Sequence, residues 1–453
     1  MGKRRALIMN KSTIEIFCDR GIFLSLCAVI FVLPVSIALL NSFSALAIFF
    51  YFIKKINNIL VFWPLKAMRL NLSGKVHFIW EGFAPIVNPL GLPLQFLALA
   101  IFISVVFSQY PILSLYAFFG KFLKSVFLYF CFVEVFRDER RIRIFLGVFL
   151  ASAFIMALSG IIQHFSGVDF LKGDMMRGGR INASFNTANG FGAYLVPVIA
   201  LTVHLLYSAI VKNRSWVLGG ALLVLLGALL ASLCWTFSRS SWVGYLVTLF
   251  VMVLLDPRKI LFAGALVVIF VFVFLPALNN VRHLYLINDD KGQGVQTENS
   301  SNDIKSILEH GGSGRLSFWE KAITIFRSSP VYGTGFNTYS RIIMRNPDQR
   351  TWWYAHNCYL QLAAETGILG LACFLWLAFI LLGQGLKYCN QIKELWPLSF
   401  LQGTVSGLFG FLVQSSLDNT FYTVQLGALM WLIFGLTVAL IQLHPSLQNQ
   451  GGR

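Results

Sequence analysis

The chain has 453 residues, of which 57% are hydrophobic and only 12% are charged. That charged fraction is about half the usual share in soluble proteins, and one core of this length cannot bury so much apolar surface, which excludes a water-soluble fold. The net charge of +17 does not indicate nucleic-acid binding, because the basic residues mostly lie in short segments between apolar runs, where membrane topology places them.

The apolar residues form runs of roughly 18–25 residues, the length of helix that spans a bilayer. The sequence therefore predicts an all-α, polytopic bundle of about 12 transmembrane helices. The first two helices are expected to be separated at Asn41-Ser42. In chain order, the expected spans are Ile22–Leu39, Ser42–Phe62, Leu92–Phe107, Leu113–Val135, Ile144–Phe165, Asn189–Val211, Trp216–Trp235, Arg239–Leu255, Ile260–Pro276, His356–Leu386, Trp396–Ser415 and Phe421–Leu443.

Basic residues determine the expected orientation of these helices. If the N-terminus is cytoplasmic, five successive inner segments are basic and the short outer turns carry almost no charge, as the positive-inside rule requires. Both termini are then cytoplasmic, and one large polar loop between Pro276 and His356 faces outward. The chain divides into helices at 1–277, the loop at 278–355 and helices with a cytoplasmic tail at 356–453. The inner basic residues are Lys54, Lys55, Lys66, Arg69, Lys75, Arg137, Arg140, Arg141, Arg143, Lys212, Arg214, Arg258, Lys259, Lys387 and Lys393.

Two arginines are candidates for binding an anion on the outer face. Arg239 lies in the tight turn Ser238-Arg239-Ser240, at or just within the membrane boundary, where an arginine is costly without an anion or a water-filled cavity. Arg315 follows a glycine-rich stretch, and Ser313 can cap a helix running through Ile325. An arginine in a first helical turn is better tolerated if an anion binds there. The alternatives are a snorkelling Arg239 and a solvated surface helix at Arg315.

His356 opens the helix that follows the large loop. A histidine at the membrane boundary is well placed as a general base near neutral pH, and Asn357 beside it can orient a hydroxyl or a sugar. The alternative is a histidine that only caps the helix start. Glu365 is out of phase with His356 on the helix and is expected to pair within the bundle beside Gly367.

Further polar groups are expected near the outer surface. Arg180, Asn182, Asn186 and Asn189 form a cluster whose amide and guanidinium groups suit a glycan or a phosphate. Lys121 and Lys124 share one helical face below this surface. They are expected to face an internal anion site, unless residues 111–120 form an interfacial helix from which both lysines snorkel.

No motif in the sequence indicates a metal or a cofactor. There is no Walker loop, no Rossmann glycine pattern and no HExxH, and the seven cysteines are scattered without a CxxC. An outward-facing enzyme meets no ATP or nucleotide sugars, so its donor must carry its own activation, for example as a lipid pyrophosphate. Guanidinium groups bind phosphate oxygens in bidentate fashion, and the outer arginines fit such a donor.

Four stretches, in order, resemble the superfamily of O-antigen ligases and O-antigen polymerases. The resemblance covers roughly Arg180 to Gly370, and it is the combination of stretches that is specific. The stretches are Arg180 with Phe185-Asn-Thr-Ala-Asn189-Gly, Ser238-Arg239-Ser240, Gly314-Arg315 through Trp319 with Pro330-Val-Tyr-Gly333-Thr-Gly335-Phe-Asn, and His356-Asn357-Cys-Tyr359-Leu-Gln with Glu365-Thr-Gly367.

This resemblance implies a metal-independent, GT-C-like glycosyltransferase in the bacterial inner membrane with a periplasmic active site. It implies transfer of a glycan from undecaprenyl pyrophosphate to an acceptor hydroxyl, with Arg239 and Arg315 holding the pyrophosphate and His356 assisting the acceptor. The first alternative is a ligase that joins the glycan to lipid A–core, and the second is a polymerase that joins repeat units. A non-enzymatic flippase or transporter is a third. A transporter is expected to have pseudo-symmetric halves and often a central inner loop, whereas the longest polar segment here is expected outside, between the ninth and tenth helices.

Overall fold

The computed structural model describes residues 13–66, 90–176, 178–212, 215–272, 315–344 and 353–443. These parts of the chain form helices, with no β-strand among them. The elements are α2 (Thr13–Val32), α3 (Ile37–Lys66), α5 (Gly91–Val106), α6 (Pro111–Ala117), the π-helix η2 (Phe118–Leu123), α7 (Lys124–Val135), α8 (Glu139–Ser166), α9 (Ala188–Tyr207), η3 (Ser208–Lys212), α10 (Trp216–Trp235), α11 (Arg239–Leu255), η4 (Pro257–Lys259), α14 (Arg315–Ser328), α15 (Tyr339–Ile343), α16 (Cys358–Cys389), α17 (Leu395–Ser415) and α18 (Val424–Gln442).

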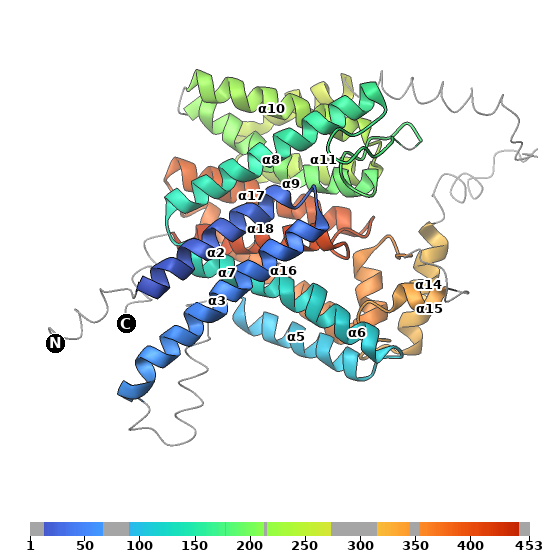
Figure 1. The fold of residues 1–453 in the computed structure, drawn as a ribbon. Coiled ribbons are helices and arrows are strands. Elements are labelled where there is room, and N and C mark those ends of the chain that lie inside the picture. The colour runs from blue at the N-terminus through green and yellow to red at the C-terminus, as the bar shows by residue number, and fades with distance from the viewer. Residues whose placement is uncertain are drawn as a thin grey trace, which may run out of the picture.

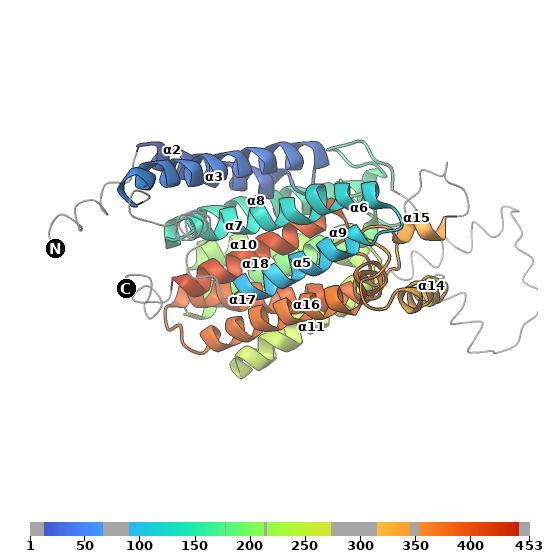
Figure 2. The same ribbon diagram turned by 90° about the horizontal axis from the view of Figure 1, so that it is seen from below.

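The long helices run side by side in a bundle, with α8, α10 and α11 on one side, α5 and α6 on the other, and α18 between them (Figures 1 and 2). Large apolar side chains remain on the outer surface of this bundle, including Val217, Phe250 and Phe379. Seven helices in the described residues are long and apolar enough to cross a membrane, and Gly91–Val106 and Arg239–Leu255 are shorter apolar helices. An outer surface of this kind is stable in lipid and not in water.

The all-α prediction is confirmed, and most predicted spans lie within a few residues of the observed helices. The separation of the first two helices at Asn41-Ser42 is wrong. The chain turns instead at residues 33–36, because Pro34 cannot continue a helical hydrogen-bond ladder, and Ser36 accepts a hydrogen bond from the N–H of Leu39 at 3.3 Å to begin α3. Ser42 donates to the carbonyl of Ala38 at 3.1 Å and continues the helix.

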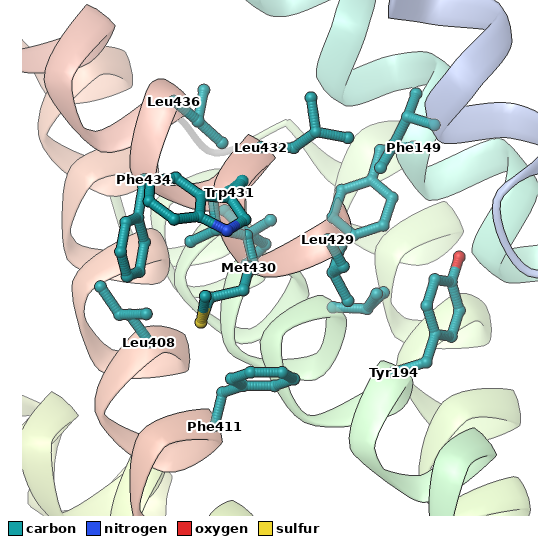
Figure 3. Close-up of a cluster of buried hydrophobic side chains, with 14 of the residues drawn as sticks. Phe149, Tyr194, Leu408, Phe411, Leu429, Met430, Trp431, Leu432, Phe434 and Leu436 are labelled. Carbon is teal, nitrogen blue, oxygen red and sulfur yellow. The ribbon is translucent and has the colours of Figure 1, made fainter. Parts of the chain in front are cut away.

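The centre of the bundle is filled by α18, which is buried along most of its length. Met430 of α18 lies near Phe411 of α17 and Trp431 lies beside Phe434, while Tyr194 of α9 and Phe149 of α8 lie on a neighbouring side (Figure 3). Aromatic side chains bury large areas in fixed orientations. The α17–α18 turn therefore projects from a rigid support.

One end of the bundle carries a buried network of ion pairs. Lys54 of α3 lies 2.6 Å from Asp19 of α2 and 2.9 Å from Glu134 of α7, and Lys55 lies 3.1 Å from the second oxygen of Glu134. The sequence predicts that both lysines lie on the inner side, and in the structure they join three helices. Arg137, which follows α7, also pairs with Glu134 at 3.1 Å.

The opposite end carries the elements of the predicted outer face. The start of α16 and the helices α14 and α15 lie together there, beside the turn between α5 and α6 (Figure 2). The predicted cap at Ser313 and most of the large loop fall outside the described residues. The described part of that loop consists of residues 315–344 and 353–355.

Candidate active site

His356 is held in an unusual backbone conformation just before α16. Its φ of 52° lies in the left-handed region, which non-glycine residues seldom adopt. The helix itself begins at Cys358, two residues later than predicted, and Asn357 is its cap. The Asn357 side-chain oxygen accepts hydrogen bonds from the N–H groups of Tyr359 and Leu360 at 3.0 and 3.1 Å. His356 therefore projects from a fixed helix start instead of capping it.

Asp418, in the turn between α17 and α18, brings the predicted outer residues together. One carboxylate oxygen lies 3.2 Å from Nδ1 of His356 and the other lies 3.8 Å from a guanidinium nitrogen of Arg315. Ser240 donates to that second oxygen at 3.4 Å, and the N–H of Asn419 donates to the first at 2.9 Å. Four segments that are remote in sequence thus meet at one carboxylate.

The surroundings of Asp418 keep its carboxylate charged. Burial alone would raise the pKa of Asp418, but the hydrogen bond and charge of His356, the N–H of Asn419 and the charge of Arg315 outweigh it and hold the pKa below its ordinary value. A charged carboxylate at Nδ1 keeps the proton of a neutral imidazole on that nitrogen. The Nε2 atom of His356 is then left as a proton acceptor, which is the state that a general base requires.

Aromatic rings flank this histidine. The Phe318 ring of α14 meets the His356 ring edge-on at 5.9 Å, and Trp353 stacks on Phe318 at 5.5 Å. With 42% of its surface exposed, Trp353 provides a partly open ring face within the same group of residues as His356.

Arg239 lies on the neighbouring turn between α10 and α11. It is the first residue of α11 and it is exposed, while Ser240 directly after it is buried against Asp418. Phe237 has a φ of 47°, so the turn that presents Arg239 is also sharply bent. The structure thus brings Arg239, Arg315 and His356 to the same end of the bundle, through Ser240 and Asp418.

Arg180 and Asn189 lie at the same end but bind to each other. The guanidinium group of Arg180 donates to the side-chain oxygen of Asn189 at 2.5 Å and to the carbonyl of Thr236 at 2.8 Å. Asn182 donates to the carbonyl of Phe185 at 2.5 Å within the same loop. These contacts fasten the loop to the turn that presents Arg239, while the substrate contact of Arg180 and Asn189 stays a prediction.

A buried carboxylate anchors the loop that precedes α15. Glu365 of α16 accepts hydrogen bonds from the N–H groups of Asn337 and Tyr339 at 2.7 and 3.1 Å. Gly367 has a φ of 66°, and a Cβ atom there would lie 2.1 Å from the carbonyl oxygen of Val331. The loop and the helix approach so closely that neither can move alone. The expectation that Glu365 pairs within the bundle is confirmed.

Lys121 and Lys124 lie apart from this group, on a cavity. Lys121 donates to the side-chain oxygen of Asn337 at 2.8 Å and Lys124 to that of Asn41 at 2.6 Å, and both line a cavity of about 660 Å³ that includes space open to the outside. This placement supports the first of the two sequence interpretations, an internal site. No residue of the cavity lining belongs to the group around Asp418.

Asp418 is a candidate site residue that the sequence did not single out. A signal existed, because Asp418 is the one acidic residue in the sequence after Glu394 and it interrupts two apolar runs. Among the residues that the structure describes, no group of three His, Cys, Asp or Glu side chains could hold a metal ion.

Residues 221–375 match the model of a protein family described as O-antigen ligase. The matched segment contains Arg239, Arg315 and His356, whereas Asp418 lies beyond its end. No curated protein matches the chain.

Proposed function

From this match, which supports an O-antigen ligase-like family of membrane glycosyltransferase-like enzymes, we propose that the protein transfers a glycan from undecaprenyl pyrophosphate to an acceptor hydroxyl. The acceptor in this proposal is lipid A–core, which makes the enzyme a ligase. The carrying observation is the meeting of His356, Arg315 and the Ser240 turn at Asp418.

In the proposed reaction, Nε2 of His356 takes the proton of the acceptor hydroxyl as its oxygen attacks the anomeric carbon of the donor sugar. The bond between that carbon and the pyrophosphate oxygen breaks, and the electron pair leaves with the undecaprenyl pyrophosphate. Asp418 stabilises the imidazolium that forms, at 3.2 Å from its Nδ1 atom.

Arg239 and Arg315 are proposed to bind the pyrophosphate. Guanidinium groups hold phosphate oxygens in bidentate fashion, and their charge favours a leaving group on which negative charge grows. A guanidinium nitrogen of Arg315 lies 3.8 Å from a carboxylate oxygen of Asp418, which is longer than a direct hydrogen bond. The carboxylate therefore orients the guanidinium group without occupying all of its N–H donors.

The proposed site faces the periplasm of a bacterium, with both chain termini in the cytoplasm. The basic residues of the opposite end support this orientation. Arg137, Arg143, Arg258 and Lys387 lie at or beyond helix ends on that side of the bundle, where the positive-inside rule places the cytoplasm.

Deletion of the gene, followed by inspection of the envelope glycan, tests the function. For a ligase, we expect uncapped core together with full-length polymer that accumulates on undecaprenyl pyrophosphate. A single repeat on the core would instead identify a polymerase. An unchanged glycan would contradict both.

Complementation of the deletion strain tests the residue roles. We expect His356→Ala, Arg239→Ala and Arg315→Ala to leave the core uncapped, while the control Lys387→Ala, at the opposite end of the bundle, restores capping. Wild-type glycan from all three site variants at matched protein levels would overturn the catalytic assignment.

A further inference from the structure

The cavity beside the candidate active site has two chemically different kinds of lining. Lys121 and Lys124 line it together with aromatic and aliphatic side chains, among them Phe122, Phe374 and Trp431. Lys121 lies ten residues along the helical segment that begins at Pro111, which is about 15 Å from its start at the helical rise per residue.

The helical segment that carries the two lysines contains a local departure from α-helical geometry. Residues 118–123 form a single π-helical turn inside the segment from Pro111 to Val135, and such turns are frequent at functional sites. Lys121 lies in that turn and Lys124 directly follows it. Like charges at this spacing repel each other, so an anion between them would remove a destabilising interaction.

The neighbours of these lysines include neutral amides. Amide oxygens of Asn337 and Asn41 each accept one hydrogen bond from a lysine, and an amide carries no charge that would neutralise an ammonium group. The carboxylate of Glu365 acts electrostatically on Lys121, and it also accepts two backbone N–H groups and the amide of Gln361.

The apolar part of the cavity lining suits a hydrocarbon chain. Phe122 contacts Trp431 edge-to-face at 6.1 Å, and Phe374 packs on Phe421 at 5.0 Å, so aromatic rings form the walls. The first residue of α18, Val424, also lines the cavity, and the start of a helix attracts negative charge. Positive charge above an apolar pocket is the arrangement that recognises an anionic lipid.

We propose that this cavity binds an anionic glycerophospholipid, with its phosphate at Lys121 and Lys124 and one acyl chain against Phe122 and Trp431. The choice of a phospholipid over the glycan donor rests on the proposed function, in which Arg239 and Arg315 take the donor pyrophosphate. The lysine cavity shares no lining residue with that site and is therefore available to a second phosphate.

Bound lipid would also reach the loop that precedes α15. The Asn337 side chain is the hydrogen-bond acceptor of Lys121, and the Asn337 N–H is held by Glu365. A phosphate at Lys121 would thus sit beside the anchor of that loop. This contact links the lipid composition of the membrane to the part of the protein that supports α15.

Trp431 offers a direct measurement of occupancy, because it lines the cavity and is only 5% exposed. The full chain is placed in nanodiscs of phosphatidylcholine that contain brominated phosphatidylglycerol or brominated phosphatidylcholine, since bromine quenches nearby tryptophan fluorescence. The Trp431 contribution is the difference between the wild type and Trp431→Phe. We expect phosphatidylglycerol to quench it at about 30-fold lower mole fraction than phosphatidylcholine, the effect of two lysines on anionic lipid.

Variants identify the group that confers this preference. Lys121→Gln with Lys124→Gln should abolish it, Lys121→Arg with Lys124→Arg should retain it because the charge is unchanged, and Lys387→Gln should behave as wild type. Wild-type preference in the glutamine variant, or equal quenching by both lipids, would overturn the proposal. So would displacement of brominated phosphatidylglycerol by undecaprenyl phosphate at equal mole fraction. Because the readout is binding, a chain without transferase activity can still pass this test.

Discussion

Replacement of Asp418 by asparagine tests the proposed general base most sharply. The amide keeps the shape of the side chain but removes the charge that would stabilise the His356 imidazolium. In one orientation its NH₂ group faces the N–H of Asn419, and in the other it faces Arg315, so a donor meets a donor in both. The variant therefore loses charge at Nδ1 of His356 and gains a mismatched contact.

The size of the effect follows from the geometry. A hydrogen bond to a charged group contributes about 1.5–3 kcal/mol, which corresponds to roughly 10- to 150-fold in rate. The distance of 3.2 Å is longer than usual for a charged pair, and the His356 side chain is 35% exposed, so the lower half of that range applies. We expect kcat to fall about 10- to 40-fold.

The assay is glycan transfer by purified protein in liposomes that contain the lipid-linked donor and the acceptor. Glu394→Gln, an exposed carboxylate at the opposite end of the bundle, is the matched control and should retain wild-type turnover. Adding Asp418→Asn to His356→Asn should cause little further loss, because the two residues act as a unit. Wild-type turnover in Asp418→Asn, or a fully additive loss in the double variant, would refute the reasoning.

The same variant has a distinct signature in the pH dependence of stability. The pKa of folded Asp418 lies below its ordinary value of 3.8, so its pairing stabilises the folded state above that value and is lost as the pH falls through the folded pKa. The difference in thermal stability between wild type and Asp418→Asn should shrink as the pH falls below about 4. A difference that grows as the pH falls below about 4 would contradict the assigned charge state.

The remaining predictions concern the supports of the site and the orientation of the chain. Gly367→Ala should lower thermal stability and abolish transfer, since its Cβ would overlap a carbonyl oxygen, whereas Gly383→Ala in the same helix meets nothing within 4 Å and should be silent. Glu365→Ala should destabilise the protein by about 1–3 kcal/mol and speed hydrogen exchange at Asn337, because buried N–H groups lose their acceptor; unchanged exchange would contradict the anchoring role. Ser416→Cys, in a chain without other reactive thiols, should react with a membrane-impermeant thiol reagent in intact cells whose outer membrane is permeable. A cysteine that does not react under these conditions would reverse the proposed orientation.

The helices could be predicted from the sequence because each bilayer span is a long apolar run, which can be recognised from local composition alone. It placed the first hairpin wrongly because the polar pair Asn41-Ser42 resembled a turn. Ser42 satisfies its hydroxyl on the preceding helical turn, and Pro34 determines the break. Side-chain polarity was a weaker signal here than the missing N–H of a proline.

For the candidate site, the topology alone predicted which turns share one end of the bundle, and Arg239, Arg315 and His356 lie there as expected. It could not predict which side chains meet. Asp418 lies in a short turn with no motif around it, and its role depends on distances that the packing of α17 and α18 creates. The mutual bonding of Arg180 and Asn189 likewise depends on a turn from another part of the chain.

The contacts around the candidate base explain how a site at a bundle end can be rigid. His356 is fixed by the capped start of α16, Asp418 by a turn on the buried helix α18, and Ser240 by the start of α11. Each group stands at the end of a packed helix, and none depends on the free movement of a long side chain. Preorganised charge is effective because it needs no rearrangement during the reaction. Flexibility, where the reaction requires it, is therefore expected in Arg239, which is exposed, and not in the pair of His356 and Asp418.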